Sequence, residues 1–138
     1  MELDLNSLIS ISSYGMRAQA GRMRTLAENI ANSSTTGTSP GADPYRRKIP
    51  VFQQMVNKEL GVKVVESGRP IDDMKDFPVK YDPSHPAADA KGYVKMPNVV
   101  PLMETIDMRE AQRSYEANLT VIEATRAMIG RTIDLLRA

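Results

Sequence analysis

His85 is the only histidine in the chain and the residue best suited to acid–base or metal chemistry. It lies between Asp82 and Asp89, so that an imidazole and a pair of carboxylates could meet around a metal ion. Zinc and catalytic iron normally draw about three strong protein ligands, and an aspartate before a proline commonly begins a turn. We therefore expect this segment to form turns, and we predict no metal site.

A second group of carboxylates, Asp72, Asp73 and Asp76, could suggest calcium binding or paired acid–base catalysis. The ligand spacing of a calcium-binding loop does not follow, and we expect a solvated loop. The chain contains no cysteine, and it lacks the motifs of phosphate-binding loops, dinucleotide sites and serine nucleophiles. The sequence therefore predicts neither an enzyme nor a cofactor.

The densest basic run is Arg46-Arg47-Lys48, which directly follows Tyr45. In the whole chain 18 basic residues balance 17 acidic ones, so nothing indicates a nucleic-acid partner. We expect Tyr45, Arg46 and Arg47 to dock against acidic residues of an adjacent subunit. The alternative is a run of solvated loop charges, since exposed ion pairs contribute only about 0–1 kcal/mol each.

The positions of the prolines divide the chain into parts. All nine lie between Pro40 and Pro101, and proline interrupts both helices and the interior of sheets. Long helices are therefore confined to the two ends. We expect an N-terminal helical part at 1–37, a middle part rich in loops and short strands at 38–101, and a C-terminal helical part at 102–138.

The N-terminal helix is expected at about Ser7–Asn32. Apolar residues recur every seven positions in it and keep one face of the helix apolar. Gly15 and Gly21 should weaken this helix by roughly 1 kcal/mol each relative to alanine, so it needs a packing partner. The residues expected to form its interface are Ile9, Met16, Met23, Leu26, Ile30 and Asn32.

The C-terminal helix is expected at Leu102–Arg137. At roughly 35 residues it would be far longer than the usual globular helix and typical of a coiled coil. Its apolar face is wide enough to contact more than one neighbour. The residues expected to form its interface are Met108, Tyr115, Leu119, Ile122, Ile129 and Leu136.

The middle part contains three short stretches typical of strands, at Gly61–Glu66, Phe77–Tyr81 and Tyr93–Met96. Turn-forming residues separate these stretches, which favours a small antiparallel sheet or hairpin. Val51–Leu60 could be a further strand or a helical turn, and the sequence leaves both possibilities open.

The fold class predicted from these patterns is mainly α, with long N- and C-terminal helices paired as an antiparallel coiled coil and a small β- and loop-rich middle region. The alternative is a helical hairpin folded over its own sheet as a compact monomer. The longer helix has more apolar face than the shorter, glycine-weakened helix can cover. The remaining apolar face should bind other chains, and an open contact between chains produces filaments or rings.

The first residues, Met1–Asn6, are acidic and contain neither a long apolar run nor a small-residue cleavage site. No segment approaches the roughly 20 apolar residues of a membrane span. We therefore expect no cleaved secretory signal and no direct membrane span, so that export would need another route.

Five stretches carry a resemblance to a known family. They are Leu26–Thr36 (LAENIANSSTT), Pro44–Lys48 (PYRRK), Tyr81–Pro86 (YDPSHP), Gly92–Val99 (GYVKMPNV) and Met108–Asn118 (MREAQRSYEAN). Together they resemble the bacterial flagellar basal-body rod protein family, and most closely its proximal-rod members of the C type. The resemblance covers nearly the whole chain.

The resemblance implies a structural subunit of the proximal rod. Its terminal helices would pack into the inner coiled-coil tube of the hollow drive shaft that transmits motor torque to the hook and filament. It would self-associate within the rod, which lies in the periplasmic space, after export through the flagellar type III export apparatus. Its partners would be the B-type and F-type proximal-rod subunits, the distal rod and the hook–basal-body junction protein FliE.

Alternatives from other functional classes stay open on the sequence alone. One is a cytoplasmic helical-hairpin adaptor or export chaperone that does not polymerise. Another is a carboxylate-dependent hydrolase acting on the cell wall, for which the sequence offers no convincing pair of carboxylates.

Overall fold

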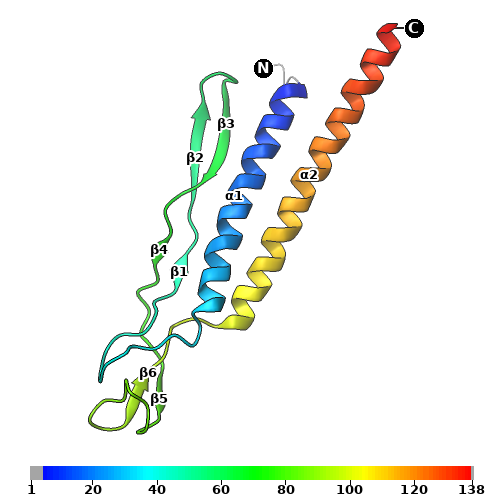
Figure 1. Cartoon of the computed structure of the whole chain (residues 1–138). Coiled ribbons are helices and arrows are strands. Elements are labelled where there is room, and N and C mark those ends of the chain that lie inside the picture. Colours follow the sequence, from blue (N-terminus) through cyan, green and yellow to red (C-terminus); the bar gives the residue numbers. More distant parts are fainter. Residues whose placement is uncertain (1–4, 138) are drawn as a thin grey trace. The chain divides into compact units, whose positions relative to one another are not determined.

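The computed structural model describes residues 5–137, so expectations about Met1–Asp4 and Ala138 lie outside the described residues. Helices α1 (Leu5–Ala31) and α2 (Pro101–Arg137) form the two ends of this part of the chain (Figure 1). Pro101 suits the first position of α2, where its missing N–H is not needed. Each helix begins and ends within about two residues of its expected position. The prediction of a mainly α chain with a small β-rich middle is confirmed.

The middle of the chain forms three two-stranded antiparallel sheets instead of one small sheet. The pairs are β2 (Phe52–Asn57) with β3 (Val62–Ser67), β5 (Val79–Tyr81) with β6 (Tyr93–Lys95), and β1 (Lys48–Ile49) with β4 (Ile71–Asp72). The undecided stretch Val51–Leu60 is therefore mainly a strand. The pairing of β1 with β4 has no counterpart in the sequence expectations, because strands of two residues leave no alternation to detect.

The chain divides into two compact units. Unit 1 combines Met1–Met23, Val51–Gly68 and Arg109–Ala138, and unit 2 combines Arg24–Pro50 and Arg69–Met108. Each unit therefore joins residues of both helices to residues of the middle. The three-part domain division expected from the prolines stays a prediction.

In unit 1 the β2–β3 hairpin lies beside α1 (Figure 1). Side chains of β3 alternate, so that Val62 and Val64 are buried while Lys63 is exposed. Gly61 closes the turn with φ of 64°, a left-handed conformation that glycine adopts without strain. Close to this turn, the Asn57 amide contacts the Tyr14 hydroxyl of α1 at 3.4 Å.

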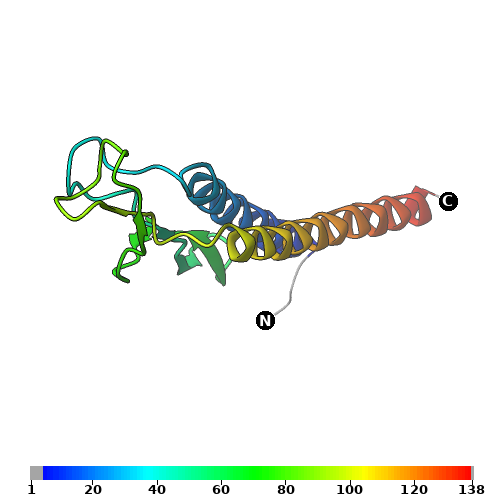
Figure 2. The ribbon, with the colours of Figure 1, turned by 90° about the horizontal axis from the view of Figure 1, so that it is seen from below.

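Helices α1 and α2 also contact each other within unit 1. The Arg22 guanidinium pairs with the Glu110 carboxylate at 3.4 Å, and Gly15 lies directly against the side chain of Asn118. The residue number in α2 falls as the number in α1 rises, which is the order of an antiparallel pair. Figure 2 shows α2 from below as one unbroken helix. Coiled-coil packing along the two helices stays a prediction.

Unit 2 buries apolar side chains of its own. They include Leu26 of α1, Ala87 of a turn and Val94 of β6. On the surface, Tyr81 and Tyr93 lie opposite each other in β5 and β6, with ring centroids 5.3 Å apart in an edge-to-face arrangement. The β5–β6 hairpin is therefore held by cross-strand aromatic contact as well as by its backbone hydrogen bonds.

Gly21 allows the hairpin to approach α1 closely. A Cβ placed on Gly21 would lie 2.3 Å from Ser67 Oγ and 2.6 Å from Ser67 Cβ, closer than folded proteins allow. Helix propensity alone predicts that Gly21→Ala would stabilise α1 by roughly 1 kcal/mol. We expect Gly21→Ala instead to lower the free energy of unfolding by about 1–3 kcal/mol, because the hairpin must move away from the helix. Urea denaturation of the purified chain measures this difference.

Gly130→Ala is the matched control in α2, because no heavy atom lies within 4 Å of a Cβ placed there. It should stabilise the chain by up to roughly 1 kcal/mol. Stabilisation of similar size in both variants would contradict the close packing of the hairpin on α1.

Candidate assembly interface

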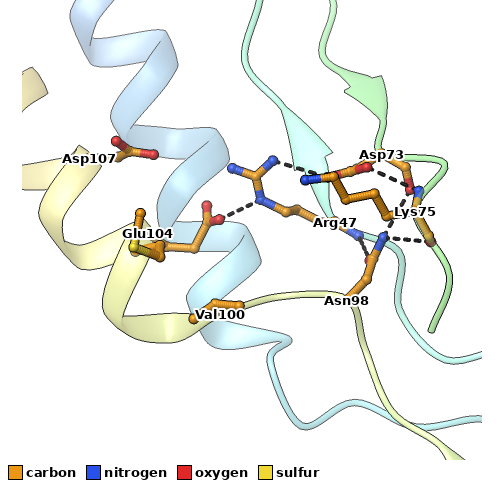
Figure 3. A pocket seen from close by; sticks show the side chains of 8 residues that line it. Arg47, Asp73, Lys75, Asn98, Val100, Glu104 and Asp107 are labelled. Atoms are coloured by element: carbon orange, nitrogen blue, oxygen red, sulfur yellow. Dashed lines mark hydrogen bonds and ion pairs between the residues drawn. The ribbon is translucent and has the colours of Figure 1, made fainter. Parts of the chain in front are cut away.

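Arg47 of the basic run extends into a polar cluster within unit 2 (Figure 3). Its Nε donates to Glu104 Oε1 at 2.5 Å, and its Nη1 lies 3.3 Å from Asp73 Oδ2. Glu104 is 1% exposed and Asp73 is 7% exposed. Both carboxylates depend on this guanidinium, because an unpaired buried charge is strongly destabilising.

Asn29, near the end of α1, uses every hydrogen-bonding position of its amide. Its Nδ2 donates to the main-chain oxygen of Lys48 at 2.7 Å and to Glu104 Oε2 at 2.9 Å. Its Oδ1 accepts from the Lys48 amide and from the Tyr45 hydroxyl, both at 2.9 Å. An asparagine amide offers about two donor and two acceptor positions, so this fully buried side chain has none left over. Asn29 thereby joins α1 to both β1 and α2.

The other residues of the basic run are also engaged within the chain. The Arg46 guanidinium donates to the main-chain oxygen of Asp73 at 2.9 Å and lies 4.1 Å from the centroid of the Phe77 ring. The Lys48 ammonium pairs with Glu28. The interpretation of this run as solvated loop charges is therefore wrong. Docking of the run against an adjacent subunit stays a prediction.

Asp73 also corrects the expectation of a solvated acidic loop. Its carboxylate accepts a hydrogen bond from the Lys75 amide at 3.1 Å in addition to its pairing with the guanidinium. Asp72 and Asp76 are exposed, as expected. The expectation failed for the middle carboxylate because the cation that pairs with it is distant in the sequence.

The residues expected from the sequence did not include Glu104 or Asn98. Asn98 Oδ1 accepts from the Arg47 amide at 2.7 Å, and its Nδ2 donates to the main-chain oxygen of Asp73 at 3.0 Å (Figure 3). For Glu104 a signal was available. It lies one turn before Met108, on the apolar side of α2, where a charge requires a buried partner.

The partners in the cluster set the ionisation of its members. Burial acts to lower the pKa of Arg47, but its hydrogen bonds and charge pairing with Glu104 and Asp73 raise it above its ordinary value. The hydrogen bond from the Lys75 amide, assisted by Arg47, holds the pKa of Asp73 below its ordinary value despite desolvation. Burial raises the pKa of the Tyr45 hydroxyl.

These pKa shifts predict how the stability of unit 2 depends on pH. Its aspartates with folded-state pKa values below the ordinary 3.8 are Asp43, Asp73, Asp82 and Asp89. Their contribution is complete above about pH 4 and is lost as the pH falls through the lowered values. The raised pKa of Tyr45 contributes below about pH 10 and is lost as the pH rises further. We expect constant stability between about pH 5 and 9, with a decline on both sides.

Urea titrations followed through the methyl NMR signals of Val94, which is buried in unit 2, measure this dependence. Asp73→Asn should make the decline on the acid side shallower. A urea-unfolding midpoint that stays constant from about pH 7 down to about pH 3 would contradict the lowered pKa values assigned to these aspartates.

His85 stabilises a turn in unit 2. Its Nδ1 accepts a hydrogen bond from the Ala87 amide at 3.0 Å, and its Nε2 lies 3.4 Å from the Thr36 hydroxyl. Asp82 and Asp89 each accept hydrogen bonds within their own turns. Within residues 5–137, no group of three or more histidine, cysteine or carboxylate side chains is placed to hold a metal ion.

The expected interface residues differ in how much of each is covered. Leu26 and Ile122 are buried, whereas Leu119 is 39% exposed and Leu136 is 83% exposed. The half-buried ones are Ile9, Met16, Met23, Ile30, Asn32, Tyr45, Arg46, Arg47, Met108, Tyr115 and Ile129. Most of this set therefore keeps area that a neighbouring chain could cover.

Direct contacts of α1 with α2 include those of Gly15, Arg22 and Asn29, which directly precede Met16, Met23 and Ile30 of the apolar stripe. One residue turns a helix by about 100°, so the stripe runs beside this line of contacts. In unit 1, Met16 lines an open groove of about 420 Å³ together with Tyr115, Leu119 and Ile122 of α2.

The last turns of α2 expose apolar side chains within unit 1. Val121, Met128 and Leu135 recur every seven residues, and all three are exposed. Beside this line, Ile133 and Leu136 are exposed as well. No helix within residues 5–137 is long and apolar enough to cross a membrane.

Comparison with known proteins places these features in a family. The family model described as "Flagellar basal body rod FlgEFG protein C-terminal" matches residues 90–135, which include most of α2. A flagellar basal-body rod protein FlgC of Agrobacterium fabrum is 49% identical over 97% of this chain and 96% of its own length. That of Aquifex aeolicus is 39% identical over 96% of this chain and 97% of its own. The FlgC protein of Escherichia coli O157:H7 is 35% identical over 95% of this chain and 97% of its own length.

Proposed function

The chain belongs to the FlgC family of flagellar basal-body rod proteins, and we propose that it enters the rod by packing the apolar faces of α1 and α2 against neighbouring subunits. Membership of this family makes it a structural subunit of the flagellar basal body that associates with other rod components, and not an enzyme. The adaptor, chaperone and hydrolase alternatives find no support among these relatives.

The observation that carries the proposal is the exposed end of α2. Leu135 is 78% exposed and Leu136 is 83% exposed, in a helix that is otherwise partly covered by its own chain. Contiguous exposed apolar surface on a soluble protein commonly marks an interaction site. The open groove between Met16 and Ile122 adds apolar surface from both helices in unit 1.

We propose, in addition, where this subunit lies in the rod, which subunits it contacts and how it is exported. The terminal helices form an antiparallel coiled coil in the inner tube of the proximal rod, a hollow shaft that transmits torque. The subunit self-associates there and contacts the B-type and F-type proximal-rod subunits, the distal rod and FliE. It reaches the periplasmic rod through the flagellar type III export apparatus. Long helices suit this role, since repeated interdigitated helix contacts give large and stiff interfaces.

A charge at the exposed end of α2 tests the proposal. Leu136→Asp should leave the isolated chain as stable as before, because this side chain is almost fully exposed in it. Incorporation into basal bodies should be lost, because an aspartate would be buried unpaired in the assembled rod. Motility of a strain that carries only this variant, with immunoblots of its purified basal bodies, measures the effect.

Ala127→Asp is the control, since it adds the same charge at an exposed position on the opposite side of α2. Control and test variants should differ in motility and agree in stability. Normal motility with Leu136→Asp would refute packing at this end of the helix.

A further inference from the structure

The seven-residue repeats of the two helices do not fix how the helices align. In α1 the stripe repeats as Ile9, Met16, Met23 and Ile30, and in α2 as Met108, Tyr115, Ile122, Ile129 and Leu136. A shift by one repeat, about 10.5 Å along the axis, again places apolar residues beside apolar residues. Alignment must therefore come from a residue that breaks the repeat.

We propose that Glu104 is the residue that sets the alignment of α2 with α1. Its buried carboxylate accepts hydrogen bonds from Asn29 of α1 at 2.9 Å and from Arg47, just before β1, at 2.5 Å. A single side chain thus links three segments that are far apart in the sequence. This role concerns the folded chain itself and does not depend on how subunits pack in the rod.

The neighbours of Glu104 along the repeat cannot replace it. The residues that follow it at intervals of seven in α2 are Ala111, Asn118, Thr125 and Thr132, none of which carries a charge. A shift by seven residues would bring Asn29 opposite Ala111 and separate it from Glu104. The carboxylate would then lose its partner on α1, and one donor of the buried amide would remain unpaired, a strongly unfavourable arrangement.

The chemistry at this position requires a carboxylate. Oε1 faces the Arg47 N–H and Oε2 faces the Asn29 amide N–H, so both oxygens must be acceptors. A glutamine has the same shape, but it would turn its own NH₂ group towards one of these donors. Glu104→Gln should therefore weaken the preference for one alignment even though it preserves packing.

A second variant separates alignment from folding. Replacing a buried ion pair by apolar side chains of similar volume is often neutral or stabilising. Asp73 also pairs with Arg47, so its charge must be removed as well. Arg47→Met/Asp73→Asn/Glu104→Met should therefore keep both helices formed, while Asn29 retains its hydrogen bonds to Lys48 and Tyr45. It should still lose the preference for one alignment, because no buried charge on α2 then distinguishes the repeats.

Disulfide trapping in the purified full chain reads the alignment, since the chain contains no cysteine of its own. Gly15→Cys/Asn118→Cys reports the observed alignment, because a Cβ on Gly15 would lie 3.0 Å from the Asn118 side chain. Gly15→Cys with either Ala111→Cys or Thr125→Cys reports a shift by one repeat in each direction. The observed pair should dominate in the natural background. The excess of this crosslink over the shifted ones should fall by about tenfold or more with Glu104→Gln and with Arg47→Met/Asp73→Asn/Glu104→Met, as expected from the loss of one charge-assisted hydrogen bond.

Glu110→Gln is the matched control on the same helix. Glu110 also pairs with an arginine of α1, but its side chain is 68% exposed, so the ratio of the crosslinks should not change. An unchanged ratio in both Glu104 variants would overturn the proposal, and so would an equal fall with Glu110→Gln. Loss of every crosslink in both Glu104 variants would overturn it too, because the proposal requires formed helices in mixed alignments.

Discussion

Asn29→Asp is expected to unfold unit 2, although the two side chains have nearly the same shape. Asn29 donates both amide hydrogens, one to the main-chain oxygen of Lys48 and one to the carboxylate of Glu104. An aspartate would present an oxygen to each of these acceptors and place a second negative charge beside the first. We expect the free energy of unfolding of unit 2 to fall by about 3–5 kcal/mol, a large part of the roughly 5–15 kcal/mol that stabilises a typical domain.

Hydrogen exchange of the purified chain measures this loss. The amides of β6 and of the last turn of α1 should exchange at least about a hundredfold faster in the variant, the factor that corresponds to losing about 3 kcal/mol. In cells the variant should not support motility.

Asn57→Asp is the matched control in unit 1. The Asn57 side chain mainly accepts hydrogen bonds, from the amides of Glu59 and Leu60, and a carboxylate accepts these equally well. Its stability should change by no more than about 0.5 kcal/mol. Similar losses of stability in the two variants would show that the hydrogen bonds donated by Asn29 do not explain its effect on stability.

Ile122→Asp is expected to separate the two helices within unit 1 and to abolish assembly. Ile122 is 8% exposed and lies at the groove that Met16 and Tyr115 also line. Arg17 and Arg126 also line this groove and would offset part of the cost of a buried carboxylate. Together with the lost apolar contacts, the replacement should still cost about 3 kcal/mol. Unit 2 has its own polar cluster and buried apolar side chains, so we expect it to remain folded.

Hydrogen exchange resolved by segment distinguishes these outcomes, with motility as the cellular measurement. Exchange should become faster in residues 109–137 and stay slow around Val94. Val121→Asp is the control for folding, because Val121 is 42% exposed and its replacement should leave the isolated chain stable. Full protection of α2 in the Ile122 variant would contradict the packing described for unit 1.

Periodicity and proline positions were sufficient to locate both helices. Their apolar repeats and freedom from internal proline leave few alternatives over such lengths. The strand at Val62–Ser67 was also predicted to within about one residue, since it is rich in valines that partly alternate with polar residues. Two-residue strands such as β1 carry no such signal and were missed.

The polar cluster could not be predicted in the same way. Glu104, Asp73 and Arg47 are separated widely in the sequence, and only the folded chain brings their charges together. For the glycines, the sequence indicated a weakened helix, whereas Gly21 is needed for the approach of Ser67. Long-range polar contacts and close backbone approaches leave no periodic trace, which is why patterns located the elements but not the contacts that join them.

A subnanometre map of isolated basal bodies would show what covers the apolar faces of α1 and α2. We expect helices of neighbouring subunits to cover Met128 and Leu136 of α2 and to fill the groove beside Met16. A map in which these positions face solvent or the lumen, with subunits joined only through the β-rich middle, would contradict this expectation.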